Sequence, residues 1–347
     1  MIISSAGCGS DQDMPGTGVS SDAPGSLTSD VTPAPAPAVP GVPDDKAEEL
    51  FENDAAWAVY WDDEDVTKKL SERAPEADII CIFEAYFDEG YGLVFNEDAK
   101  ALFEKLKNDP AGKDRKYYLT FVNDVVGTAS TKQKDTDVLY SILQDPAKHA
   151  SDIVEMAKDN GFDGIEIDYE KIRKDEKLWE LFTVFEKELI AACRNEGLDI
   201  RVVLEPSTPV SKLEFPEGPE YVVMCYNLFG YGTKPGPKAD EEFLSELVSD
   251  FEALPGDTGY ALANGGFDWD LADGSVTSLT DEEGRQLLSE HAGKAVRDEK
   301  SGVMTFTYNK DGAEHEVWVA DDETLENWSR ILHEKTGRKV KISLWRI

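Results

Sequence analysis

The stretch GFDGIEIDYEKI, residues 161–172, decides how this chain is expected to fold. Apolar or aromatic residues alternate in it with acids: Ile165, Glu166, Ile167, Asp168, Tyr169 and Glu170. This period of two is typical of a β-strand and puts the three acids on one face.

The flanking segments have apolar residues at helical spacing, and Asn160-Gly161 and Gly197 are typical helix stops. A strand between two helices is covered on at least one face, where unpartnered carboxylates are costly to bury. The alternative is a chance cluster on a solvated face, since 71 of the 347 residues are acidic. We favour a functional site.

Other segments with strand composition alternate with helical patterns along the rest of the chain. They are 56–61, 77–87, 115–123, 199–206, 220–229, 258–267 and 338–345. Together with the acidic strand they predict an α/β fold, a (β/α)8 TIM barrel, within residues 48–347. Two β-like runs around NKDG, residues 309–312, predict a hairpin between the seventh and eighth strands. We therefore expect a small α+β insertion at about residues 272–320.

Composition limits the partners of the protein. The formal net charge of −36 argues against nucleic acid or an anionic membrane surface as a partner, and it is compatible with a neutral sugar. Cys81, Cys193 and Cys225 lie in apolar runs and are expected to be small buried hydrophobic residues. Neither they nor the four histidines have metal-ligand spacing. We expect no metal, no cofactor and no obligatory disulfide, and a monomer because no dimerisation stripe is evident.

Residues 1–47 differ from the rest of the chain in composition. They are rich in Gly, Ser, Asp and Pro, which predicts an extended, disordered linker. The sequence SSAGC, ending at Cys8, resembles the lipidation site of a bacterial lipoprotein, although only seven residues precede the cysteine. The alternative is a free cysteine in a disordered tail. We favour lipidation, and with it an exported protein anchored to the cell surface.

A parallel barrel has its active site at the C-terminal ends of its strands. Glu170 is expected at such an end, with Asp168 one layer deeper and Glu166 deeper again. Asp163 has the opposite parity, so we expect it to hold backbone rather than act on a ligand. Further candidates for lining a groove, because they lie near strand ends, are Trp61 and Glu84.

Several motifs resemble those of family 18 glycoside hydrolases, the chitinase-like enzymes. DGIEIDYE, residues 163–170, is similar to the signature D-G-x-D-x-D-x-E, and MCYN, residues 224–227, is similar to M-x-Y-D. SLWRI puts Trp345 where the family has a tryptophan on its last strand. GGFDW and HEVW resemble the branch of bacterial spore and peptidoglycan N-acetylglucosaminidases. The resemblance covers residues 55–347 and implies a retaining hydrolase of β-linked N-acetylglucosamine polymers, peptidoglycan or chitin-like.

The resemblance also implies roles for single residues. Glu170 would protonate the glycosidic oxygen and later deprotonate water, while the substrate's own N-acetyl oxygen acts as the nucleophile. Asp168 would orient the acetamido group, and Tyr226 would donate its hydroxyl to the acetamido oxygen. Trp345 would form the floor under the sugar ring. We expect the like charges of Asp168 and Glu166 to keep Glu170 protonated.

Two positions depart from the family pattern. Glu166 stands in place of the second Asp of the signature, and Asn227 in place of the Asp after the tyrosine. Both are counted among the expected sugar-binding residues. The change at Asn227 supports an alternative, a carbohydrate-binding surface protein with the same fold and little or no turnover.

Overall fold

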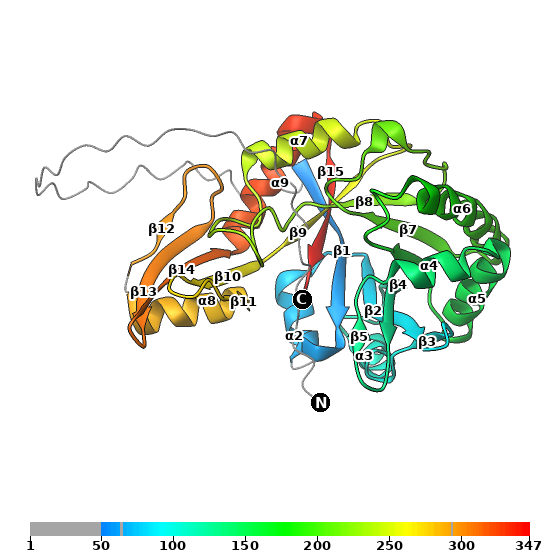
Figure 1. Cartoon of the computed structure of the whole chain (residues 1–347), viewed down its shortest axis with the longest axis horizontal. Helices are drawn as coiled ribbons and strands as arrows, with labels where there is room; N and C mark the ends of the chain where they lie inside the picture. Colours follow the sequence, from blue (N-terminus) through cyan, green and yellow to red (C-terminus); the bar gives the residue numbers. More distant parts are fainter. Residues whose placement is uncertain (1–49, 63–64, 293) are drawn as a thin grey trace, which may run out of the picture.

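The computed structural model describes residues 50–62, 65–292 and 294–347. The expected linker at 1–47 and the expected lipidation site at Cys8 lie outside these residues. A barrel of parallel strands, covered by helices, makes up most of the described chain, and a smaller antiparallel sheet lies beside it (Figure 1).

The barrel is closed and its strands follow one another in chain order. They are β1 (Phe51–Val59), β2 (Ile79–Asp88), β4 (Lys116–Val126), β6 (Gly164–Asp168), β7 (Asp199–Leu204), β8 (Glu220–Met224), β9 (Gly259–Ala263) and β15 (Val340–Trp345). Each pairs in parallel with the next, and β15 pairs in parallel with β1. Short antiparallel strands, β3 (Leu93–Phe95) and β5 (Thr131–Lys132), extend β2 and β4. The predicted (β/α)8 barrel is confirmed.

Helices surround the barrel, and all but the first of those named here begin at a residue whose side chain accepts a backbone N–H of the first turn. They are α2 (Val66–Arg73), α3 (Glu97–Asn108), α4 (Thr136–Ile142), α5 (Pro146–Asp159), α6 (Glu176–Glu196), α7 (Glu241–Phe251) and α9 (Asp322–Thr336). The side chain of Asp175 accepts a hydrogen bond at the start of α6, and Gly197 ends this helix in the left-handed region, with a φ of 71°. A 3-10 turn, η2 (Val210–Lys212), stands in the fully described connection from β7 to β8, where the regular fold has an α-helix.

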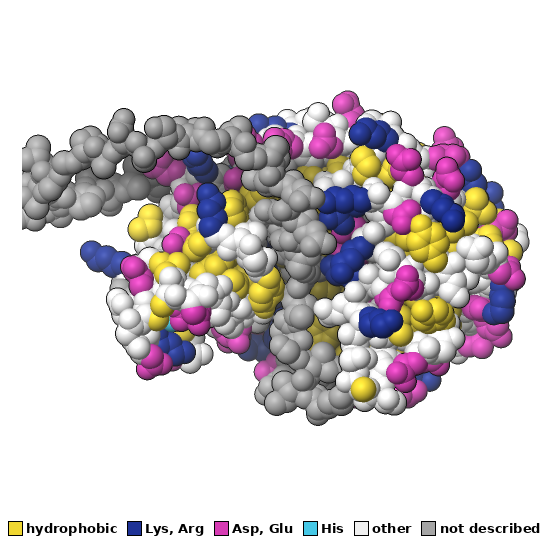
Figure 2. Space-filling view, in the orientation of Figure 1, with side chains coloured by type: hydrophobic (Ala, Val, Ile, Leu, Met, Phe, Trp, Pro, Cys, Tyr) yellow, Lys and Arg dark blue, Asp and Glu magenta, His cyan; other side chains and the backbone are white. Residues whose placement is uncertain are grey.

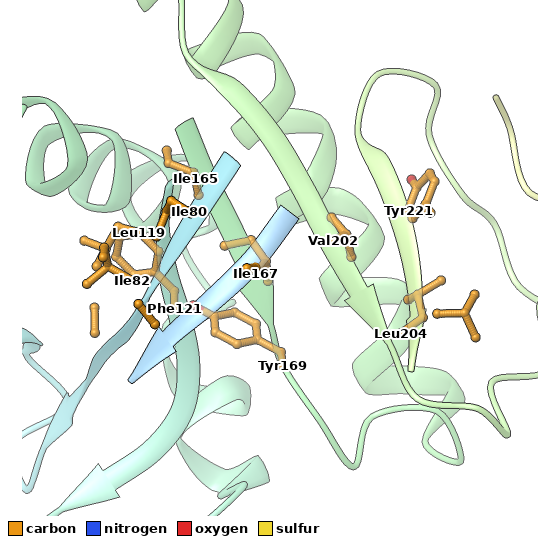
Figure 3. Packing of buried hydrophobic residues seen from close by; sticks show 14 of the residues in the cluster. Ile80, Ile82, Leu119, Phe121, Ile165, Ile167, Tyr169, Val202, Leu204 and Tyr221 are labelled. Carbon is orange, nitrogen blue, oxygen red and sulfur yellow. The ribbon is translucent and has the colours of Figure 1, made fainter. Parts of the chain in front are cut away.

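The alternation along β6 separates two environments. Ile165, Ile167 and Tyr169 pack with the apolar layer between strands and helices, to which Phe121 and Val202 also belong (Figure 3). Glu166, on the opposite face of the strand, has no exposed surface and bonds to residues inside the barrel. The acids are therefore the half of the pattern that faces the barrel interior.

The second sheet follows β9 and precedes β15, so an insertion between the seventh and eighth barrel strands is confirmed, although its first strand begins at Gly265 and not at about residue 272. Its strands, in spatial order, are β11 (Val276–Leu279), β10 (Gly265–Asp270), β14 (Ala313–Ala320), β13 (Met304–Lys310) and β12 (Val296–Arg297). Helix α8 (Asp281–Leu287) and the π-helical turn η3 (Leu288–Ala292) pack on it.

Gly265 explains why the expected strand 258–267 is two strands. Its φ is 66°, and a Cβ atom there would lie 2.3 Å from the carbonyl oxygen of Leu279. Only glycine fits such a turn. The chain therefore leaves the barrel after Ala263, and the second sheet begins at Gly265.

Candidate active site

Glu170 lies just beyond the C-terminal end of β6, and its backbone is held by a side chain of β4. The Glu170 backbone N–H donates to Asn123 Oδ1 over 2.9 Å, and Asn123 Nδ2 donates to the Glu170 carbonyl over 3.1 Å. Both residues are buried, with Glu170 8% and Asn123 1% exposed. The candidate acid therefore has a fixed backbone position at the C-terminal ends of the barrel strands, where barrels of this kind have their active sites and which we call the catalytic rim.

Lys134 gives Glu170 a cationic partner. Its Nζ lies 2.6 Å from Glu170 Oε2, and the lysine side chain is only 15% exposed. An ion pair at this distance stabilises the ionised carboxylate. The expectation that like charges keep Glu170 protonated did not include this buried cation, and it stays a prediction.

Asp168, at the end of β6, lies in surroundings that favour its protonated form. Burial raises its pKa well above the usual range, and the charge of Glu170 raises this pKa further, while Lys134 acts in the opposite direction. Asp168 Oδ1 is buried and has no hydrogen-bond partner in the structure. An orphaned acceptor of this kind is costly unless a ligand or water satisfies it.

Glu166 is part of a network inside the barrel. Its Oε1 accepts from Trp57 Nε1 over 2.6 Å and from Thr120 Oγ1 over 2.8 Å. Its Oε2 lies 3.3 Å from Cys81 Sγ and 3.5 Å from Arg201 Nε. The side chain has no exposed surface, so this arrangement disfavours the predicted contact between Glu166 and a sugar. Its role is to hold the barrel interior below Asp168.

Aromatic rings extend from this network toward the surface. The ring of Trp345 lies 5.8 Å from that of Trp57 and 5.2 Å from that of Phe83, which is in turn 5.7 Å from Trp61. Tyr226 belongs to the same cluster inside the barrel, against which Trp345 packs. Trp61 is 38% exposed and ends the row at the surface. The structure thus brings together Tyr226, Trp345 and Trp61, the three aromatic residues expected from the sequence to contact a sugar.

Two further candidates lie on β2 and after β8. Glu84 of β2 is 8% exposed, and burial, followed by the charge of Asp124, raises its pKa to about 8. Asn227 follows β8 and has a φ of 66°, a left-handed conformation that asparagine tolerates better than most residues. Both fall on the catalytic rim, as expected from their positions in the chain.

The sequence did not single out Glu205, Lys134 or Asn123. Glu205 follows β7 directly, forms an ion pair with Arg173 and accepts the backbone N–H of Lys171 over 2.9 Å. Burial and the charge of Glu170 raise the pKa of Glu205, so it faces the same acid. The rule that functional side chains follow barrel strands could have identified Glu205.

Other predictions concern residues away from the rim. Cys81, Cys193 and Cys225 are buried, as expected. Asp163 Oδ2 accepts the backbone N–H of Tyr117 over 2.9 Å, which confirms its expected structural role. Within residues 50–62, 65–292 and 294–347 no group of acids, histidines and cysteines is arranged to bind a metal ion. Among the described helices, none is both long and apolar enough to cross a bilayer.

A cavity of about 750 Å³ lies at the opposite end of the barrel from Glu170. Asp54, Arg201, Glu220 and Lys341 are among its lining residues, and they lie at or near the N-terminal ends of strands. Arg201 Nε is 3.7 Å from Glu220 Oε2, and Arg201 Nη1 is 3.8 Å from Asp54 Oδ2. This end of a barrel usually serves stability, so we do not assign the chemistry to it.

Solved structures share this fold. The spore cortex-lytic enzyme SleL of Bacillus cereus superposes with a TM-score of 0.68 at 15% identity, over 86% of this chain and 71% of that one. A chitinase from Chromobacterium violaceum gives a TM-score of 0.66 at 17% identity, over 84% of this chain and 94% of that one. A family 18 chitinase from Cycas revoluta, in complex with (GlcNAc)3, gives 0.64 at 15% identity, with coverages of 84% and 94%. Neither a family model nor a curated protein matches the sequence.

The barrel and its insertion define the class of protein as an α/β barrel with a rim of buried carboxyl groups. Within that class, the chain has the chitinase-like fold of family 18 glycoside hydrolases.

Proposed function

We propose that this protein is a retaining glycoside hydrolase that cleaves β-linked polysaccharides next to N-acetylglucosamine. The observation that carries the proposal is the pair at the end of β6. Glu170 is a buried carboxyl at the catalytic rim, and beside it Asp168 Oδ1 is buried without a partner. The motif that contains both residues and the fold support the same reaction.

In the proposed first step, Glu170 protonates the oxygen of the bond that breaks. The N-acetyl oxygen of the sugar attacks its own anomeric carbon from the other side and forms an oxazolinium ion, as in substrate-assisted glycosidases. Asp168 accepts a hydrogen bond from the acetamido N–H through its orphaned Oδ1, which orients the nucleophile. Glu170, now ionised, then removes a proton from the water that opens the ring.

The aromatic residues would bind the sugar. Tyr226 donates its hydroxyl to the acetamido oxygen, and the ring of Trp345 lies under the apolar face of the sugar. Trp61, at the exposed end of the aromatic row, stacks on a neighbouring sugar unit. Glu84, which burial favours in its neutral form, can donate a hydrogen bond to a sugar hydroxyl.

Peptidoglycan is the polymer we propose first, with chitin-like chains as the second candidate. The HEVW motif and the likeness of the fold to a spore cortex-lytic enzyme favour peptidoglycan. Lipidation at Cys8 would anchor the enzyme at the cell surface, where this polymer is found.

The alternative function is sugar binding without turnover. Asn227 in place of the family's Asp supports it, because a neutral amide binds the acetamido or hydroxyl groups differently. The ion pair between Lys134 and Glu170 is a second observation in its favour, since an ionised acid cannot donate a proton.

The two functions are separated by product release. Wild type, Glu170→Gln and the matched surface variant Glu180→Gln are incubated with a fluorogenic N-acetylglucosamine oligosaccharide and with purified peptidoglycan. Release by wild type and by Glu180→Gln, but not by Glu170→Gln, supports the hydrolase. Binding of the sugar without release by any of the three proteins supports the alternative.

A further inference from the structure

Lys134 is an unusual residue to find beside the acid. The chain has 71 acids and 35 bases, and yet a lysine that is 15% exposed lies 2.6 Å from Glu170 Oε2. Many surface ion pairs contribute little and depend on flexible side chains. This pair is buried on both sides, because the side chain of Glu170 is only 11% exposed.

The backbone around Lys134 is fixed from both directions. The Lys134 N–H donates to Asp124 Oδ1 over 2.8 Å, and Lys134 has a φ of 54°, in the left-handed region that non-glycine residues seldom adopt. Next to it, the Asp135 N–H donates to the Asn123 carbonyl over 2.8 Å, and Asn123 Nδ2 donates to the Asp135 carbonyl over 3.2 Å. Left-handed non-glycine residues held in this way concentrate at functional sites.

Asn123 links the two partners of the ion pair. The same side-chain amide that holds the Asp135 carbonyl also holds the backbone N–H and C=O of Glu170. The lysine and the acid are therefore positioned by one residue of β4, and their contact does not depend on a mobile surface loop. Because one residue positions both partners, we infer that Lys134 affects the chemistry of Glu170.

Charged groups from four sides surround the pair. Asp168 comes from β6, Asp124 from β4, and Glu205 from the end of β7. Lys171, in the loop after β6, also acts on Asp124, and Arg173 is paired with Glu205. The charge of Asp124 acts on Glu84 of β2, and the charge of Glu166 acts on Asp168. Among these groups of the described residues, Lys134 contacts Glu170 directly.

We propose that Lys134 is a positioning residue that, before substrate binds, keeps a proton on Asp168 and off Glu170, and so sets the upper pH limit of cleavage. The inference rests on the proposed function. When the polysaccharide binds, the ion pair between Lys134 and Glu170 opens and the proton passes from Asp168 to Glu170. Glu170 then donates this proton to the glycosidic oxygen. The raised pKa of Asp168 agrees with this distribution of the proton.

The first test does not need turnover. The carboxyl stretch of protonated Glu170 is identified by infrared difference spectroscopy as the band that is absent in Glu170→Gln. It is followed against pH in wild type, Lys134→Met, Lys134→Arg and the exposed neighbour Lys132→Met. In Lys134→Met the band should persist to a pH about one to two units higher, while Lys134→Arg and Lys132→Met should follow wild type. An unchanged titration in Lys134→Met overturns the inference.

The second test uses the pH dependence of kcat/KM on the oligosaccharide. The alkaline limb should move upward by a similar amount in Lys134→Met and be restored in Lys134→Arg. An equal loss of rate at every pH would overturn the inference, because it would show a purely structural role. Absence of turnover in wild type would refute the proposed function instead, and the infrared titration would then decide alone whether Lys134 controls the proton.

Discussion

Asn123 and Glu170 are joined by two hydrogen bonds of opposite direction, one from the Glu170 N–H to Asn123 Oδ1 and one from Asn123 Nδ2 to the Glu170 carbonyl. Both groups are buried, and the chain passes from strand to loop at Glu170. The position of the candidate acid thus depends on a neutral side chain of the neighbouring barrel strand.

Replacing Asn123 should affect stability and activity together. Asn123→Ala leaves the Glu170 N–H and two backbone carbonyls without their partner, so the free energy of unfolding should fall by about 2–3 kcal/mol. Urea unfolding measures this loss, and turnover of the oligosaccharide measures the displacement of Glu170. Asn108→Ala, the same change on the exposed end of α3, should alter stability by less than about 0.5 kcal/mol. Equal effects of the two variants would contradict the account.

The buried pair of Glu166 and Arg201 should behave as a coupled unit. Glu166→Gln leaves Arg201, which is 1% exposed, with less compensating charge, and should cost about 3–5 kcal/mol. Arg201→Met should cost a similar amount, and the double variant should cost clearly less than the sum of the two. A double-mutant cycle by urea unfolding measures the coupling. Additive losses would show that the two side chains do not stabilise one another.

Asp54 should make stability depend on pH. Burial, followed by the charge of Glu220, raises its pKa from 3.8 to about 6. Because the folded state holds the proton more tightly, the stabilisation is complete below the unfolded value and is lost as the pH rises through about 6. Relative to Asp54→Asn, wild type should lose at most about 3 kcal/mol between pH 4 and pH 8. Unfolding curves of both proteins across this range provide the check, and a constant difference would contradict the assignment.

How much of this could be predicted from the sequence depends on the range of each interaction. The period of two in residues 164–169 is a local property, so it was enough to predict β6 and the burial of its acids. The contact between Lys134 and Glu170 joins positions 36 residues apart, and no periodicity marks the loop that carries the lysine. The expectation for Glu170 was based only on its neighbours on the strand, so it did not include this cation.

The break after Ala263 was also missed, although a local signal exists. ANGG, residues 263–266, contains a glycine pair that predicts a turn, and the structure has a positive φ at Gly265. The apolar residues on both sides made one strand the simpler interpretation. Glu205 was missed for a different reason: it was included in a predicted strand, and its position at the catalytic end was not used.

Trp61 and Trp345 should differ in what they contribute. Trp61 is 38% exposed, so Trp61→Ala should leave the melting temperature nearly unchanged and raise KM for long oligosaccharides up to about tenfold. Trp345 packs between Trp57 and Phe83, so Trp345→Ala should lower both stability and activity. Thermal unfolding and steady-state kinetics separate the two effects. A large loss of stability in Trp61→Ala would argue against a sugar-binding role for its exposed face.

The most direct measurement compares two leaving groups in wild type and Glu170→Gln. If Glu170 donates the proton, its loss should lower kcat/KM on an oligosaccharide, whose leaving sugar needs protonation, by about 10²–10⁴-fold. The loss should be at least about tenfold smaller on an aryl glycoside, whose acidic phenol leaves without a proton. Equal losses on both substrates, or full activity of Glu170→Gln on the oligosaccharide, would contradict the claim that Glu170 is the acid.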